Sequence, residues 1–296
     1  FNVNDSPLAG TEGDKVTGRM IGDRLTKEGE GNITLTIKKS NTDGSYLVSG
    51  RGELQLSVLI ETMRREGYEL SVSRPQVLMH NDQNGNILEP IEEVIIDVDD
   101  EYTGQIVQDL NLRKAVMIEM KPFGEARTRL IFEAPTRGLI GYQSELLTAT
   151  SGTAVINRLF SRYEAFRGEI KGRTNGVLIS NGKGNSVAFA LFNLEERGQM
   201  IIGSGTSVYQ GMIIGIHTRP NDLEVNVLKG KKLNNIRTHA KDEAVKLVSP
   251  LDMNLEKAIA WISDDELIEV TPKSIRIRKR LLDPTQRKKL AREKTT

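Results

Sequence analysis

Cysteine is absent from the sequence, and aromatic residues make up only 5% of its 296 residues. Without cysteine the chain has no disulfide, no thiolate nucleophile and no zinc or iron–sulfur site built on cysteine ligands, which fits a reducing compartment. The sequence also lacks an apolar run near the roughly 20 residues of a membrane-spanning helix, and its start lacks the basic and apolar regions of a signal peptide. We therefore expect a soluble cytoplasmic protein that does not bind membranes.

Patterns that predict catalysis or a metal site are equally scarce. The three histidines, His80, His217 and His239, are far apart and form no HExxH-type motif. The glycine-rich NGKGNS at 181–186 lacks the GxxxxGKS/T spacing of a phosphate-binding loop and is interpreted as a turn. The acids of DVDDEY at 97–102 precede a predicted helix and are interpreted as favouring its N-terminal end rather than binding calcium. A catalytic triad assembled from distant residues would leave no such pattern, so an enzyme with an unrecognised site stays an alternative.

Charge is distributed unevenly along the chain, although the formal net charge is only +1. Residues 1–80 carry 10 Lys and Arg against 11 Asp and Glu, residues 81–165 carry 8 against 14, and residues 166–296 carry 23 against 15. The basic last segment indicates a polyanionic partner for that segment. A merely solvated basic surface would give the same counts and stays an alternative.

Apolar periodicity divides the chain into three predicted domains. In residues 1–75, strands alternate with two helices, at 16–29 and 50–67, in the order βαββαβ. Residues 76–165 repeat that order, with helices at 101–114 and 137–152. The repeat predicts two ferredoxin-like sandwiches in tandem, each with its helices on one face of an antiparallel sheet.

Residues 166–296 form the third predicted domain, in which glycine-containing turns separate short apolar runs. That pattern predicts a mostly-β, barrel-like domain with a short helix at 254–262 and a strand at 274–281. The charged tail at 283–296 is expected to fray. The predicted class is therefore α+β.

The strongest candidate for a binding site is VLKGKKLNNIRTHAK at 227–241, which contains no acid and no aromatic residue. Its cations can neutralise phosphates, and its small and amide side chains permit close approach to a shaped RNA, with Asn234 and Asn235 as partners for base edges or 2′-hydroxyls. It lacks the aromatic platform on which single-strand binders stack bases. A flexible solubilising loop is the alternative interpretation. The candidate residues are Lys229, Lys231, Lys232, Asn234, Asn235, Arg237, His239 and Lys241.

A second basic candidate is the predicted strand SIRIRKRL at 274–281. Alternation places Arg276, Arg278 and Arg280 on one face, about 7 Å apart, near the spacing of successive phosphates. Lys279 crosses to the apolar face, and all four residues are candidate RNA contacts. The alternative is the solvated outer face of a sheet.

Longer motifs carry a family resemblance. GRGELQLSVLIETMRREG at 50–67 resembles the second helix of domain III in translational GTPases of the elongation factor G class, and APTRGLIGYQSELLTATSGTA at 134–154 resembles the second helix of domain V. NGVLISNGKGNSVAFALFNLEERG at 175–198 and the loop GKKLNNIRTHAKDEAV at 230–245, which elongation factor G lacks, are similar to the TypA/BipA family of ribosome-binding translational GTPases. The resemblance covers essentially the whole chain.

The resemblance implies the C-terminal half of such a GTPase: domain III, domain V and a family-specific C-terminal domain. Since a Walker A loop, an NKxD motif and a domain II are all missing, it implies that GTP and Mg²⁺ belong to an N-terminal half and that this chain is not itself an enzyme. The implied partners are the 50S and 70S ribosome, its rRNA and the acceptor end of A-site tRNA, contacted by a monomer through the basic loop. The implied roles are translation regulation, ribosome assembly and stress adaptation. The rival reading is a standalone regulatory or scaffold protein whose ferredoxin-like pair binds a protein or small ligand.

Overall fold

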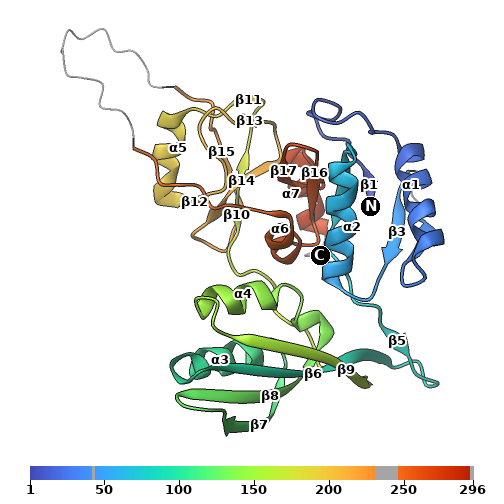
Figure 1. Cartoon of the computed structure of the whole chain (residues 1–296). Helices are drawn as coiled ribbons and strands as arrows, with labels where there is room; N and C mark the ends of the chain where they lie inside the picture. Colours follow the sequence, from blue (N-terminus) through green and yellow to red (C-terminus); the bar gives the residue numbers. More distant parts are fainter. Residues whose placement is uncertain (42–43, 231–245, 294–296) are drawn as a thin grey trace. The chain divides into compact units, whose positions relative to one another are not determined.

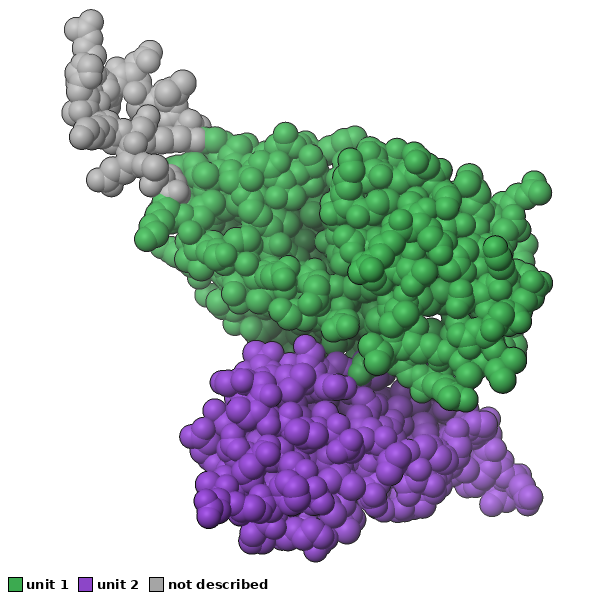
Figure 2. All heavy atoms as spheres, in the orientation of Figure 1, with its two compact units in different colours: residues 1–74, 173–296 green, residues 75–172 purple. Residues whose placement is uncertain are grey.

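The computed structural model describes residues 1–41, 44–230 and 246–293. Two compact units make up the chain, unit 1 with residues Phe1–Arg74 and Arg173–Thr296, and unit 2 with residues Pro75–Gly172 (Figure 2). The first and third predicted domains thus lie in one compact unit. The division into domains at 1–75, 76–165 and 166–296 stays a prediction, because compactness alone does not define family domains.

Unit 2 has the predicted βαββαβ order (Figure 1). The strands pair antiparallel in the spatial order β7-β8-β6-β9, and a short β5 extends β6. This is the ferredoxin-like arrangement that the sequence predicts. The elements are β5 (His80–Asn81), β6 (Ile87–Asp99), the 3-10 turn η1 (Asp100–Tyr102), α3 (Thr103–Leu112), β7 (Val116–Pro122), β8 (Arg127–Pro135), the 3-10 turn η2 (Thr136–Gly138), α4 (Tyr142–Ala149) and β9 (Val155–Ala165).

The core of unit 2 lies between its sheet and its two helices. Alternate residues of β6, Val94, Ile96 and Val98, face the same side and are fully buried, as the two-residue period of a strand requires. They pack in one cluster with Ile106 of α3 and Leu146 of α4. The other side chains of β6 therefore form a second face, which carries charged pairs.

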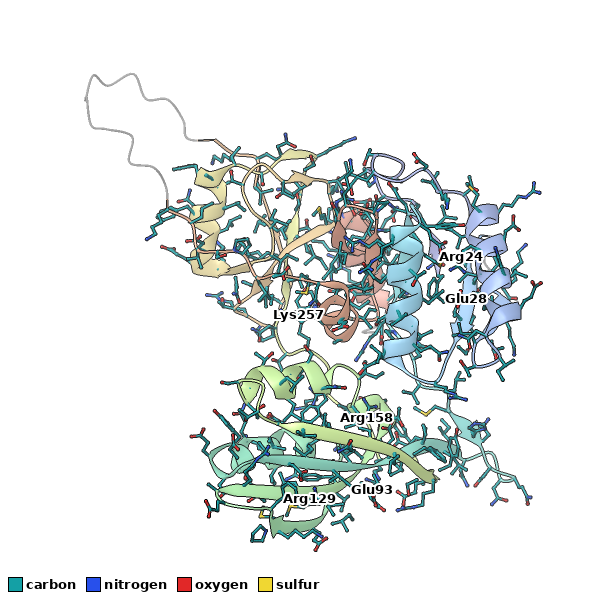
Figure 3. All side chains as sticks on the ribbon, viewed as in Figure 1. Arg24, Glu28, Glu93, Arg129, Arg158 and Lys257 are labelled. Carbon is teal, nitrogen blue, oxygen red and sulfur yellow. The ribbon has the colours of Figure 1, made fainter. Side chains whose placement is uncertain are left out.

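One such pair should make the stability of unit 2 depend on pH. Arg129 of β8, labelled in Figure 3, donates to both carboxylate oxygens of Asp97 of β6, at 2.6 and 2.7 Å. These hydrogen bonds hold the pKa of Asp97 below its ordinary value. A lowered carboxyl pKa adds stability above the unfolded value of about 3.9 and loses it as the pH falls through the folded pKa.

We therefore expect amides of β6 and β8 to lose protection from hydrogen exchange as the pH falls below about 4, and to lose less in Asp97→Asn. At pH 7 the substitution should cost on the order of 1 kcal/mol. The same acid-induced loss in wild type and Asp97→Asn would contradict the assignment.

The first segment of unit 1 also follows the order βαββαβ. Strand β1 pairs with β4, and the N–H of Tyr46 in β3 donates to the carbonyl oxygen of Phe1 at 2.8 Å. Strands β2 and β3 pair in a two-stranded sheet of their own, and the Tyr46–Phe1 hydrogen bond places β3 beside β1. The resulting order β2-β3-β1-β4 is again ferredoxin-like. The elements are β1 (Asn2–Val3), α1 (Gly18–Gly31), β2 (Thr36–Lys39), β3 (Tyr46–Ser49), α2 (Glu53–Arg65) and β4 (Leu70–Ser73).

Six strands of the third segment extend the sheet that contains β1 and β4, while β11 and β13 pair with each other in a separate two-stranded sheet. The spatial order is β1-β4-β16-β17-β14-β10-β15, with β12 also on β14. Within the described residues these strands do not close into a barrel; they form an open sheet, and the α+β class is confirmed. The elements are β10 (Val177–Ser180), β11 (Gly184–Asn185), α5 (Ala188–Leu194), the 3-10 turn η3 (Glu195–Arg197), β12 (Gly198–Met200), β13 (Ser207–Val208), β14 (Met212–His217), β15 (Leu223–Val225), α6 (Leu255–Trp261), β16 (Glu266–Val270), β17 (Ile275–Lys279) and α7 (Pro284–Glu293).

Strands β4 and β16 join the two segments of unit 1. They pair antiparallel over four residues, and Ser71 lies opposite the fully buried Glu269. The Glu269 carboxylate accepts hydrogen bonds from the Tyr209 hydroxyl at 2.6 Å, the Ser6 hydroxyl at 2.8 Å and Arg276 at 2.9 Å. Burial and the neighbouring Glu269 raise the pKa of Tyr209, so this hydroxyl stays a donor. A buried carboxylate with this many donors stabilises the joint between the segments.

The C-terminal tail differs from its prediction. Residues Pro284–Glu293 form the helix α7 instead of a frayed end. The carboxylate of Asp283 accepts a hydrogen bond from the N–H of Thr285 at 2.9 Å, which caps the first turn, and Pro284 occupies the first helical position, where its missing N–H has no cost.

Candidate nucleic-acid interface

Most of the predicted basic loop lies outside the described residues. The structure describes Lys229 and the strand residues Arg276, Arg278, Lys279 and Arg280. The remaining candidates stay predictions from the sequence: Lys231, Lys232, Asn234, Asn235, Arg237, His239 and Lys241.

The two ends of that loop are fixed to one hydrophobic cluster. On the incoming side Val227 is fully buried, and its carbonyl oxygen accepts from the N–H of Val187 at 2.9 Å. Leu228 and Leu247, one on each side of the loop, pack against the same cluster. The N–H of Val248 also donates to the Glu195 carboxylate at 2.8 Å. Unit 1 therefore holds both ends of the loop on a rigid base.

Three exposed lysines surround this base, and we call Lys183, Lys229 and Lys246 the loop-root lysines. The turn that carries Lys183 lies on Leu228, the residue before Lys229: a Cβ added at Gly182 would be 3.1 Å from a Leu228 methyl group. Among the described residues none of the three has an acid partner. No acid in the described part of the chain therefore neutralises their charges.

The sequence did not single out Lys183 and Lys246. The signal for Lys183 was the NGKGN turn itself, which sets a lysine between two glycines and was interpreted only as a turn. For Lys246 the signal was weaker, because it is one more cation after the basic loop.

The arginine strand has a different environment from the predicted one. Strand β17 lies inside the sheet between β16 and β14, and only 8% of Arg276, 1% of Arg278 and 2% of Lys279 is exposed. The expected solvent-facing row is wrong, because acids of the segment after β1 cover that face: Glu12 pairs with Arg276 and Asp5 with Arg278.

Lys279 is enclosed by acids on the other face of β17. Its ammonium group is 2.7 Å from Asp222, 2.9 Å from Asp265 and 3.0 Å from Glu266. Burial alone would lower the pKa of Lys279, but the charge of Glu266 and the hydrogen bonds to Asp222 and Asp265 raise it. Of the four strand candidates only Arg280 is exposed, with one side-chain hydrogen bond to the carbonyl oxygen of Asp264 at 3.2 Å. RNA contact by this strand stays a prediction. For Arg276, Arg278 and Lys279, burial does not favour such a contact.

The described parts of the chain show neither a metal site nor a membrane-spanning helix. They contain no cluster of three or more potential metal-ligating side chains. None of their helices combines the length and the apolar character needed to cross a bilayer.

Comparison with known proteins adds the decisive observation. Two family models match: the TypA/BipA C-terminal domain over residues 175–284 and the elongation factor G C-terminus over residues 86–174. The proteins named large ribosomal subunit assembly factor BipA from Salmonella typhimurium and Escherichia coli K12 are each 52% identical over 293 residues, 99% of this chain and 48% of theirs. The Haemophilus influenzae protein of that name is 50% identical over 297 residues, 100% of this chain and 48% of its own. The chain belongs to the TypA/BipA family.

The chain spans about half the length of these TypA/BipA relatives. It corresponds to their C-terminal half, which confirms the resemblance found in the sequence. The TypA/BipA C-terminal domain model covers the basic loop, its root and β17, and it ends at Pro284, where α7 begins.

Proposed function

We propose that this chain is the ribosome-contacting part of a cytoplasmic translational GTPase that takes part in assembling the large ribosomal subunit. The relatives named for that process support this role more directly than a role in translation regulation or stress adaptation. GTP and Mg²⁺ would be bound by residues outside this chain, which would have no GTPase activity of its own. It would act as a monomer and contact rRNA and the acceptor end of A-site tRNA.

The observation that carries the proposal is the contrast between two groups of cations in unit 1. The cations of β17 are buried against carboxylates, whereas the loop-root lysines are exposed and have no acid partner among the described residues. Exposed cations without partners can bind phosphates and release their counterions. A loop fixed at both ends on a rigid base can present its cations at a defined place on an RNA surface.

Co-sedimentation with purified ribosomal particles tests the partner. At about 50 mM salt, where phosphate contacts are strong, we expect the chain to sediment with large subunits and with 70S particles, and at least about tenfold less with small subunits. An acidic protein of similar size serves as the control for protein that is trapped non-specifically in the ribosome pellet. Equal sedimentation with both subunits, or with neither, would contradict the proposal and favour a standalone regulatory or scaffold protein.

A further inference from the structure

The C-terminal helix α7 is fixed to the body of unit 1 by its first turn. The guanidinium group of Arg287 donates to the carbonyl oxygens of Leu281 and Leu282 and pairs with the carboxylate of Glu224. The connection before α7 packs tightly on the start of β14, since a Cβ at Gly211 would be 2.8 Å from the Cα of Leu282. The helix therefore has a defined position and is not a free tail.

The rest of α7 presents basic side chains to solvent. The helix contains Arg287, Lys288, Lys289 and Arg292 against a single acid, Glu293. Lys288 and Lys289 are exposed, and neither has an acid partner among the described residues. Arg292 is exposed as well. The exposed surface of α7 thus carries two adjacent cations, Lys288 and Lys289, that no acid in the described part of the chain neutralises.

The helix shares its anchor with the basic loop. Glu224, which pairs with Arg287, belongs to β15, the strand that leads into the loop root. Lys229 follows Glu224 by five positions, so the chain between them spans at most about 18 Å. Loop root and helix can therefore contact the same extended polyanion.

We propose that α7 is a second RNA-binding element, in which Lys288 and Lys289 bind backbone phosphates of the RNA that the loop contacts. This inference rests on the proposed function. A membrane surface fits less well, because a membrane-binding helix needs a broad apolar face and the large apolar side chain that α7 exposes is Leu290, at 42%. An acidic protein partner is the other outcome that the test must distinguish.

The test compares three versions of the 296-residue chain: wild type, K288E/K289E and a control, K38E/K39E. The control reverses a second adjacent pair of exposed lysines, in β2, and changes the net charge equally. Binding to large subunits is measured between about 50 and 200 mM salt. For K288E/K289E we expect the dissociation constant to rise roughly tenfold at the lower salt, and the slope of log K against log salt to fall in magnitude by about two. For the control variant we expect both quantities to stay within about twofold of wild type.

Each outcome decides one point. An unchanged constant and slope for K288E/K289E, with wild type binding, would overturn the inference and leave the proposed function in place. No binding by wild type would overturn both. The same loss on protein-free rRNA supports an RNA contact, whereas a loss seen only with intact subunits would show a contact with a ribosomal protein and overturn the RNA assignment. The variant K288Q/K289Q removes the two positive charges without adding negative ones, so its comparison with K288E/K289E distinguishes lost attraction from added repulsion. Equal melting temperatures of wild type and all variants serve as the folding control.

Discussion

Arg276→Ala is expected to lower the free energy of unfolding of unit 1 by about 3–5 kcal/mol, because it leaves a buried charge without its partner. Glu269 is fully buried and would lose the one cation that pairs with it among the described residues, and Glu12 would lose its pairing with Arg276 too. The hydroxyls of Tyr209 and Ser6 would still donate to Glu269, but neutral donors do not replace the positive charge.

Urea titration of tryptophan fluorescence measures this effect in unit 1 alone. The chain contains a single tryptophan, Trp261, in α6. The matched control is Arg280→Ala, which removes the exposed arginine that directly follows the same strand and should cost less than about 0.5 kcal/mol. Equal midpoints for the two variants would contradict the structural role of Arg276.

The largest effect on binding is expected from reversing three loop charges, Lys231, Lys232 and Arg237, to glutamate. If the loop neutralises phosphates, the variant loses three attractive contacts and gains three repulsive ones, so affinity for large subunits should fall roughly a hundredfold at low salt. Unit 1 should keep its melting temperature, because the described core, including the cluster that holds the loop root, contains none of the three.

The matched control reverses three exposed lysines elsewhere in unit 1, with K27E/K38E/K39E. It makes the same change in net charge and should bind within a fewfold of wild type. If the loop variant lost affinity and thermal stability together, or lost no more affinity than this control, the loop would not be an RNA contact.

The two ferredoxin-like orders could be predicted because local patterns encode them. Val94, Ile96 and Val98 alternate along β6, and the buried Leu59 and Met63 of α2 are four residues apart, as one face of a helix requires. The pairing of β4 with β16 could not be predicted, because residues 70–73 and 267–270 are far apart in the sequence. No local pattern specifies a strand's partner at that distance. The shared open sheet was therefore predicted as a separate barrel-like domain.

The alternation of basic and apolar residues also led to a wrong prediction for β17. It separated the two faces of the strand correctly but did not show that both faces are covered. The missing signal was in the preceding strand, whose acids match the register of the cations: Glu269 lies opposite Arg276, and Glu266 lies opposite Lys279. Complementary charges on paired strands favour buried ion pairs over an open basic face. For α7 the signal was the Asp283–Pro284 pair, which is typical of a helix start.

The most direct test of the central claim, that this chain binds the ribosome through phosphate contacts, is the salt dependence of its binding to purified large subunits. If the loop cations and the loop-root lysines contact RNA phosphates, the logarithm of the binding constant should fall linearly with the logarithm of the salt concentration, with a slope of roughly −3 or steeper. A slope near zero, with tight binding at all salt concentrations, would show that the contact does not involve phosphates and would contradict the account.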